Sequence, residues 1–284
     1  MILYKYISPE RTGFFSNNSP NTLKRKDSKE LKDEAYLSGF FPNFELVASI
    51  PSELNDPFEC MVNVQVNKGK YFDSLLKDPT SSIEYISKSF GEIIHNAKEL
   101  KSFVRRIKNK ITNSQLIEIH NRAVYKSNNK LLAIISFSKN YANILMWSHY
   151  CKSHKGIVLE FDIDGNSTDY SLQEVIYTKK PQNRKLEDFK DSSFPTESLY
   201  TKSDIWSYEE EVRMLQMRPK NLSPKKLFKY SFDPNFLKSI KFGIMTDECL
   251  KKRIVNYCKT SCSHVTFYQM GISDSEYALK EHSV

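Results

Sequence analysis

Short stretches of apolar and β-branched residues predict strands at both ends of the chain. The opening ILYKYI at residues 2–7 and ELVASI at 45–50 are two of them. Between residues 58 and 66, apolar side chains occupy every second position, which is the repeat of a half-buried strand. Further strand-like segments follow residue 130: LLAIISF, GIVLEFD, QEVIYT, EVRMLQM, SIKFGI and HVTFYQM.

The hydrophobic period changes from two to about 3.6 between residues 71 and 129. Ile83, Ile86 and Phe90 illustrate the helical spacing, which recurs through the segment. We therefore expect a helical insert over 71–129, another helix over 247–258, and a loop over the polar stretch 16–32. These elements predict a single α+β domain over 1–284, with a mixed, mainly antiparallel sheet.

Composition narrows the class of protein only a little. The 284 residues include 42 Lys and Arg against 34 Asp and Glu, a net charge of +8 that is spread along the chain. Diffuse positive charge attracts nucleic acid at low salt but does not specify a nucleic-acid binder. The chain has no apolar run of about 18 residues, no signal-peptide pattern and no CxxC pair among its five cysteines. We expect a cytoplasmic protein without a membrane segment.

Two polar segments next to predicted strands are candidate site elements. The stretch NILMWSHYCKSHKGIVLEFD at 143–162 holds one of only two tryptophans, Trp147, followed by His149 and Tyr150. A tryptophan before a strand is usually a core residue, whereas His149 and Tyr150 could together hold a planar ligand. Asn55 and Asp56 begin an Asx-Pro turn, which is either a simple turn or one edge of the same cleft.

The acidic segment WSYEEEVR at 206–213 precedes an apolar strand. On a strand, Glu209, Glu211 and Arg213 would share one face. Carboxylates that approach a core require partners, so this face could place two carboxylates and a cation in a cleft. The alternative is a ladder of ion pairs facing solvent.

Motifs for metals and common cofactors are absent. Cys249, Cys258, Cys262 and His264 do not have the spacing of a zinc finger or zinc ribbon. The sequence contains no P-loop, GxGxxG, HExxH or GxSxG motif. We therefore predict no metal site.

Four motifs in a fixed order resemble a widespread bacterial family of unknown function. They are LYKY near the start, S-x-LNDPFE at 52–59, MWSHY-x-x-x-x-KGIVLEFD at 146–162, and W-x-YE-x-E-x-R at 206–213. Where that family typically has Ala after WSHY, this chain has Cys151, which argues against a catalytic role for that cysteine. The resemblance implies that these motifs belong to one constellation.

A more distant resemblance suggests a reaction. The order of Lys5 on the first strand, Ser136-Phe137-Ser138, and a late Glu209-x-Glu211 is similar to that of ADP-ribosyltransferases of the arginine–serine–glutamate type. The early arginine of that pattern is missing here. Other members of the superfamily use a histidine and a tyrosine, for which His149 and Tyr150 are candidates although they follow the serine strand.

This second resemblance implies an ADP-ribosyltransferase-like fold and NAD as a substrate. In such an enzyme Glu211, Glu209 and His149 would be catalytic, and a carboxylate would stabilise the oxocarbenium-like state at the ribose. The residues expected to contact NAD are Tyr4, Lys5, Tyr6, Asn55, Asp56, Ser136, Ser138 and Tyr150. The acceptor would be RNA, DNA or a protein, and a toxin or phage-defence effector of this kind would have an antitoxin or inhibitor protein as a partner.

Two other classes of function compete with this interpretation. In a non-enzymatic module that binds nucleic acid or protein, the acidic strand would pair with Lys or Arg and the aromatic residues would be core. A metal-dependent hydrolase would use Asp56, His149, Glu209 and Glu211, but no pair of them has metal-ligand spacing. The sequence leaves the ADP-ribosyltransferase and the non-enzymatic binding module open.

Overall fold

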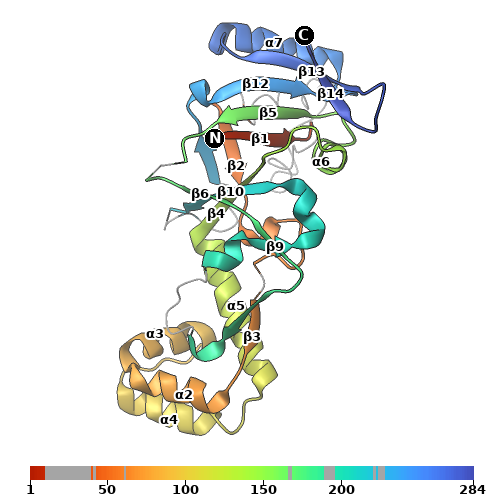
Figure 1. The fold of residues 1–284 in the computed structure, drawn as a ribbon. Coiled ribbons are helices and arrows are strands. Elements are labelled where there is room, and N and C mark those ends of the chain that lie inside the picture. The colour runs from red at the N-terminus through yellow and green to blue at the C-terminus, as the bar shows by residue number, and fades with distance from the viewer. Residues whose placement is uncertain are drawn as a thin grey trace, which may run out of the picture.

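The computed structural model describes residues 1–9, 40, 43–60, 62–165, 168–188, 196–219, 222 and 228–284. The loop predicted over 16–32 lies outside these residues. The described chain forms a body built on a large sheet and a separate lobe of helices (Figure 1). The predicted α+β class is confirmed.

The main sheet has eight strands in the order β14-β13-β12-β5-β1-β4-β10-β6. In that order the strands span Leu279–Ser283, Thr266–Ile272, Leu237–Phe242, Ile157–Asp162, Ile2–Ile7, Leu132–Ser138, Glu211–Met217 and Ser171–Glu174. All neighbours are antiparallel except β12 and β13. That parallel pair is connected through helix α7 (Glu248–Ser261), as a parallel crossover requires. The expected mixed, mainly antiparallel sheet is confirmed.

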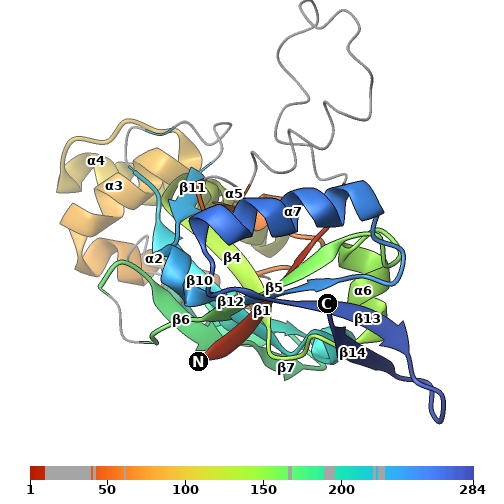
Figure 2. The ribbon, with the colours of Figure 1, turned by 90° about the horizontal axis from the view of Figure 1, so that it is seen from above.

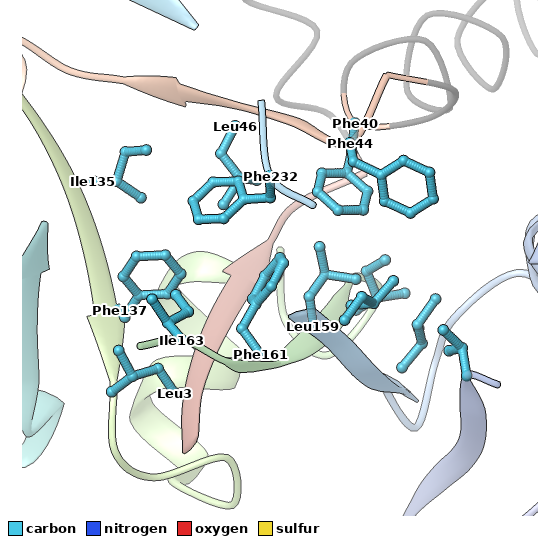
Figure 3. Close-up of a cluster of buried hydrophobic side chains, with 14 of the residues drawn as sticks. Leu3, Phe40, Phe44, Leu46, Ile135, Phe137, Leu159, Phe161, Ile163 and Phe232 are labelled. Atoms are coloured by element: carbon cyan, nitrogen blue, oxygen red, sulfur yellow. The ribbon is translucent and has the colours of Figure 1, made fainter. Parts of the chain in front are cut away.

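The two faces of the sheet are buried differently. Helix α7 lies across one face (Figure 2), together with the two-stranded pair β2 (Glu45–Ala48) and β11 (Phe228–Ser231). In Figure 3 the side chains of Leu46 and Phe232 face Phe137 and Phe161 across this core. Helix α6 (Ile144–Tyr150) packs on the other face, where Trp147 is fully buried, as expected of a core tryptophan.

The helical lobe contains α2 (Lys68–Lys77), α3 (Pro79–Phe90), α4 (Ala97–Ile107) and α5 (Asn113–Leu131). It has a core of its own, and α5 leads directly into β4. Residues 82–124 are fully described and contain no strand. In the described part of the chain, no helix combines the length and apolarity needed to cross a membrane.

Short elements join these parts. Two parallel pairs are β3 (Val62–Gln65) with β8 (Gln182–Lys185), and β7 (Ile176–Thr178) with β9 (Thr201–Ser203). The 3₁₀ helices are η2 (Pro51–Glu53), η3 (Leu186–Asp188), η4 (Thr196–Tyr200), η5 (Asp204–Glu209) and η6 (Pro234–Phe236). The strand predicted over 58–66 is wrong in its first half. Residues 57–60 form turns, and Cys60 has a φ of 58° that no strand accommodates.

Gly156 allows β5 to approach β1. A Cβ at this position would lie 2.1 Å from the carbonyl oxygen of Ile7, the residue that pairs with Ile157. The preceding residues Lys152, Ser153 and His154 all have left-handed backbone conformations, with φ of 46°, 52° and 65°. The backbone conformation of the turn before β5 is therefore tightly constrained, and the close approach to Ile7 accounts for the glycine in the KGIVLEFD motif.

Gly156→Ala should lower the free energy of unfolding by more than about 3 kcal/mol, because the added methyl group displaces β1 from β5. Gly165→Ala is the matched control, since a Cβ there meets no atom within 4 Å. We expect that variant to stay within about 0.5 kcal/mol of the wild type in urea unfolding. Equal effects of the two substitutions would contradict this account of the turn.

Candidate functional site

The main sheet opens between β1 and β4. The two strands share a single pairing, Tyr4 with Ser138, and then diverge. Farther along, the free edge of β4 pairs with Ser49 instead, since Ser49 and Ile134 exchange backbone hydrogen bonds of 2.9 and 2.8 Å. The opening is thus bounded by β1, β4 and the segment that ends β2.

A cavity of about 390 Å³ occupies this opening. Its polar lining comes from segments far apart in the sequence. Seven of the polar lining residues belong to the three adjacent strands β1, β4 and β10: Tyr4, Lys5, Tyr6, Ser136, Ser138, Glu211 and Arg213. Others come from outside these strands and include Asn55, Glu59, Tyr150, Lys202 and Glu209. The volume lies within the usual range for small-molecule sites, about 300–1,000 Å³.

Arg213 is the most connected charged side chain in the wall. Its Nε and Nη2 donate to the two carboxylate oxygens of Glu211 at 2.8 and 3.1 Å, a bidentate arrangement. Its Nη1 lies 2.6 Å from Glu59 Oε1 and donates to the carbonyl oxygen of Leu199 at 2.5 Å. The guanidinium has no exposed surface, so all its contacts are with protein groups.

Lys202 supplies the second buried cation. Its Nζ lies 2.5 Å from Glu209 Oε2 and 3.2 Å from Glu211 Oε2, and 4.9 Å from the ring centre of Trp206. The side chains of Lys202, Glu209 and Glu211 are each only 3–4% exposed. Three carboxyl groups and two cations are therefore packed together at one wall of the cavity.

The pKa values of two carboxyl groups in the cluster are shifted in opposite directions. Burial would raise the pKa of Glu211, but the charges of Arg213 and Lys202 and hydrogen bonds from Arg213 and Ser136 outweigh it and lower the pKa to about 2. For Glu59, burial dominates and raises the pKa even though Arg213 opposes the shift. Neighbouring carboxyl groups with divergent pKa values are typical of acid–base sites.

Tyr150 connects the cluster to the turn at 55–56. Its hydroxyl donates to Glu209 Oε1 at 2.5 Å and accepts a hydrogen bond from Asn55 Nδ2 at 2.6 Å. Burial and the charge of Glu209 raise the pKa of Tyr150, so the phenol stays protonated and remains a donor. Across the opening, Lys5 Nζ donates to the carbonyl oxygen of Ser136 at 2.7 Å, which spans the gap between β1 and β4.

Residues 146–214 match the model of a family described as "Protein of unknown function (DUF2971)". This segment resembles DUF2971. The match confirms the predicted resemblance to an uncharacterised family, and it assigns no activity. It contains Tyr150, Lys202, Glu209, Glu211 and Arg213. No curated protein and no solved structure matches the chain.

Two predicted site residues lie away from the cavity. His149, in the DUF2971 segment, is exposed, and its ring centre lies 6.4 Å from those of Tyr150 and Tyr208. Asp56 is buried within its turn, where Oδ1 accepts from the backbone N–H of Phe58 at 2.9 Å. The other predicted residues line the cavity: Tyr4, Lys5, Tyr6, Asn55, Ser136, Ser138, Tyr150, Glu209 and Glu211.

The prediction that Glu209, Glu211 and Arg213 share one strand is wrong for Glu209. That residue ends the 3₁₀ helix η5, and Glu210 has a left-handed φ of 43° before β10 begins at Glu211. Glu209 therefore reaches the cluster from a different direction. Glu211 and Arg213 do lie on one face of β10, because they are two residues apart on that strand.

Glu59 and Lys202 are site residues that the sequence analysis did not single out. Glu59 is the last residue of the LNDPFE motif, so its place in that motif beside the Asx turn is the feature of the sequence that could have identified it. Lys202 lies in the short polar strand β9 and has no local pattern that marks it. Its role depends on ion pairs with residues seven and nine positions later, across a 3₁₀ helix.

Trp147 and Cys151 of the DUF2971 segment serve packing. The indole N–H of Trp147 donates to the carbonyl oxygen of Tyr141 at 2.6 Å, and its ring stacks with that of His154. Cys151 is fully buried, and burial raises the pKa of its thiol, which disfavours the nucleophilic thiolate. Within the described ranges, no group of three or more His, Cys, Asp or Glu side chains could hold a metal ion.

Arg213→Met should lower the free energy of unfolding by about 3–5 kcal/mol, because it leaves Glu59 and Glu211 buried without their guanidinium partner. The control is Lys229→Met, which removes a cation from the partly exposed pair with Glu45. We expect the control to cost less than about 1 kcal/mol. A small effect of Arg213→Met in denaturant unfolding would show that the network is not required for stability.

The lowered pKa of Glu211 predicts a specific pH dependence. A carboxyl group whose pKa falls from 4.5 to about 2 on folding stabilises the protein above pH 4.5, and this contribution is lost as the pH falls towards 2. The stability difference between wild type and Glu211→Gln should therefore be constant at neutral pH and shrink between those values. Urea unfolding at a series of pH values measures it, and a pH-independent difference would contradict the assignment.

Proposed function

We propose that the cavity is the active site of an ADP-ribosyltransferase-like enzyme that uses NAD as a substrate. The observation that carries this proposal is the convergence of three segments on adjacent strands. Lys5 of β1, Ser136 and Ser138 of β4, and Glu211 of β10 border one cavity. These are the segments in which the sequence resembles the arginine–serine–glutamate pattern, although the early position is a lysine.

The reaction would break the bond between the ribose C1′ and the nicotinamide nitrogen. Nicotinamide leaves with the bonding electron pair as a neutral molecule, and positive charge develops at C1′ and the ring oxygen. Glu211, held ionised by Arg213 and Lys202, would stabilise that charge. An oxygen or nitrogen of the acceptor then bonds to C1′, and its proton passes to Glu209.

Other side chains in the wall suit the binding of a dinucleotide. Tyr4, Tyr6 and Tyr150 offer aromatic rings, and Ser136, Ser138 and Asn55 offer groups that can hydrogen-bond ribose hydroxyls. The proposal covers RNA, DNA or protein as acceptor, in the cytoplasm. A toxin or antiviral role with an inhibitor protein as a partner belongs to it by analogy alone.

A non-enzymatic binding module is the second candidate, and one observation favours it. Glu209 and Glu211 already have partners in Lys202 and Arg213, so the cluster can be explained as a brace between β10, β9 and the turn at 55–60. In that case the cavity would bind a ligand without chemistry. The two candidates differ in whether NAD is consumed.

Glu211→Gln should reduce nicotinamide release from NAD by about a hundredfold or more, equivalent to about 2.7 kcal/mol of barrier. The matched control is Glu160→Gln, which removes a carboxylate paired with the buried Lys241 but does not line the cavity. That control should keep wild-type turnover. Melting temperatures measured with and without NAD establish that each variant is folded and whether it binds.

Two results would contradict the enzyme, and a third would contradict the role of Glu211 in it. Wild-type protein that neither consumes NAD nor gains thermal stability from it would remove NAD from the proposal. Stabilisation by NAD without turnover would favour the binding module. Full activity in folded Glu211→Gln would assign this carboxylate to the structural brace.

A further inference from the structure

Nearly all the net positive charge of the chain is located in the helical lobe. Residues 68–130 hold 13 of the 42 Lys and Arg and 6 of the 34 Asp and Glu, which gives +7 of the total +8. The remaining sequence has 29 cations and 28 anions and is almost neutral. The net positive charge is therefore not spread evenly along the chain, because the helical lobe is strongly basic and the rest of the chain is almost neutral.

The acidic side chains of the lobe are already engaged. Two of them serve as helix-capping groups: Asp78 accepts from the backbone N–H of Ser81, and Glu99 accepts from that of His95. The other four form ion pairs: Glu84 with Lys88, Glu92 with Arg106, Asp73 with Lys108, and Glu118 with Arg122. Little negative charge is left in the lobe to neutralise its other cations.

Nine cations of the lobe have no carboxylate partner within this fully described segment; Lys68 donates to the carbonyl oxygen of Ile111, and the other eight are exposed. These eight are Lys70, Lys77, Lys98, Lys101, Arg105, Lys110, Lys126 and Lys130. Lys98, Lys101 and Arg105 follow each other at spacings of three and four residues on α4, so they form one stripe. The opposite face of α4 carries Leu100, Phe103 and Val104, which pack into the lobe.

We propose that the Lys98–Lys101–Arg105 stripe binds the phosphate backbone of a nucleic acid. The stripe extends about 10 Å along the helix axis, at about 1.5 Å per residue. A duplex presents one phosphate charge per about 1.7 Å of its axis, so several phosphates lie within reach of these cations. Release of counterions from the nucleic acid would drive the association.

The composition of α4 favours a nucleic acid over an acidic protein. Protein interfaces depend on buried aromatic or aliphatic anchors, and α4 exposes no large hydrophobic side chain. A surface with cations and no apolar anchor suits a partner whose affinity is electrostatic. Binding at this stripe does not depend on the reaction proposed for the cavity, and it is measured without NAD.

The test is fluorescence anisotropy with a labelled duplex DNA and a labelled single-stranded RNA at several salt concentrations. The variant Lys98→Glu/Lys101→Glu/Arg105→Glu should bind at least about tenfold more weakly at low salt. Its plot of log affinity against log salt should be shallower by about 2 to 3, since each phosphate contact contributes about 0.7 to 0.9. The corresponding Gln variant should give the same slope change with a smaller loss.

The matched control makes the same charge change on the sheet body, with Lys238→Glu/Lys252→Glu/Lys259→Glu. These three lysines are exposed and lie on β12 and α7. An equal loss in lobe and control variants would reduce the effect to net charge and overturn the proposal. It would also be overturned if the wild type binds neither probe at low salt, or if polyglutamate of equal charge competes as well as the nucleic acid. Circular dichroism checks that each variant is folded.

Discussion

Arg213 joins three parts of the chain that are distant in sequence. Its guanidinium contacts Glu211 on the same strand, Glu59 in the turn after η2, and the carbonyl oxygen of Leu199 at the end of η4. A buried guanidinium needs all its hydrogen bonds from protein, so these segments have to be in place together. Lys202 adds Glu209 to the same group. The wall of the cavity is therefore a consequence of satisfying one buried cation.

A second constraint decides where the cavity is. Along its full length β4 pairs with β10, while its other edge pairs once with β1 and then with Ser49. β1 meanwhile stays fully paired with β5, which Gly156 permits. Because β1 remains paired with β5 and β4 remains paired with β10, the two halves of the sheet separate between Tyr4 and Ser49. The polar side chains of three strands then face one space.

The sequence predicted well what depends on neighbours along the chain. The β-branched runs indicated strands that became β4, β5, β12 and β13, and the helices α2 to α5 lie where apolar residues recur at helical spacing. It predicted poorly what depends on distant pairing. Alternation could not reveal that Glu210 adopts a left-handed conformation and redirects Glu209. His149 and Tyr150 were considered together, but successive residues of a helix point about 100° apart, so only Tyr150 reaches the cavity.

The energetic cost of the charged cluster bears on its purpose. Each ion removed from water carries a penalty of several kcal/mol, and well-packed hydrophobic residues often replace a buried ion pair with no loss of stability. A brace between β10 and its neighbours would therefore not require five charged groups. Their position at the wall of a cavity, rather than within the closed core around Phe161, gives the charge access to a ligand. A Glu211 whose pKa is lowered lies beside a Glu59 whose pKa burial raises, and neighbouring carboxyl groups with divergent pKa values are typical of acid–base sites.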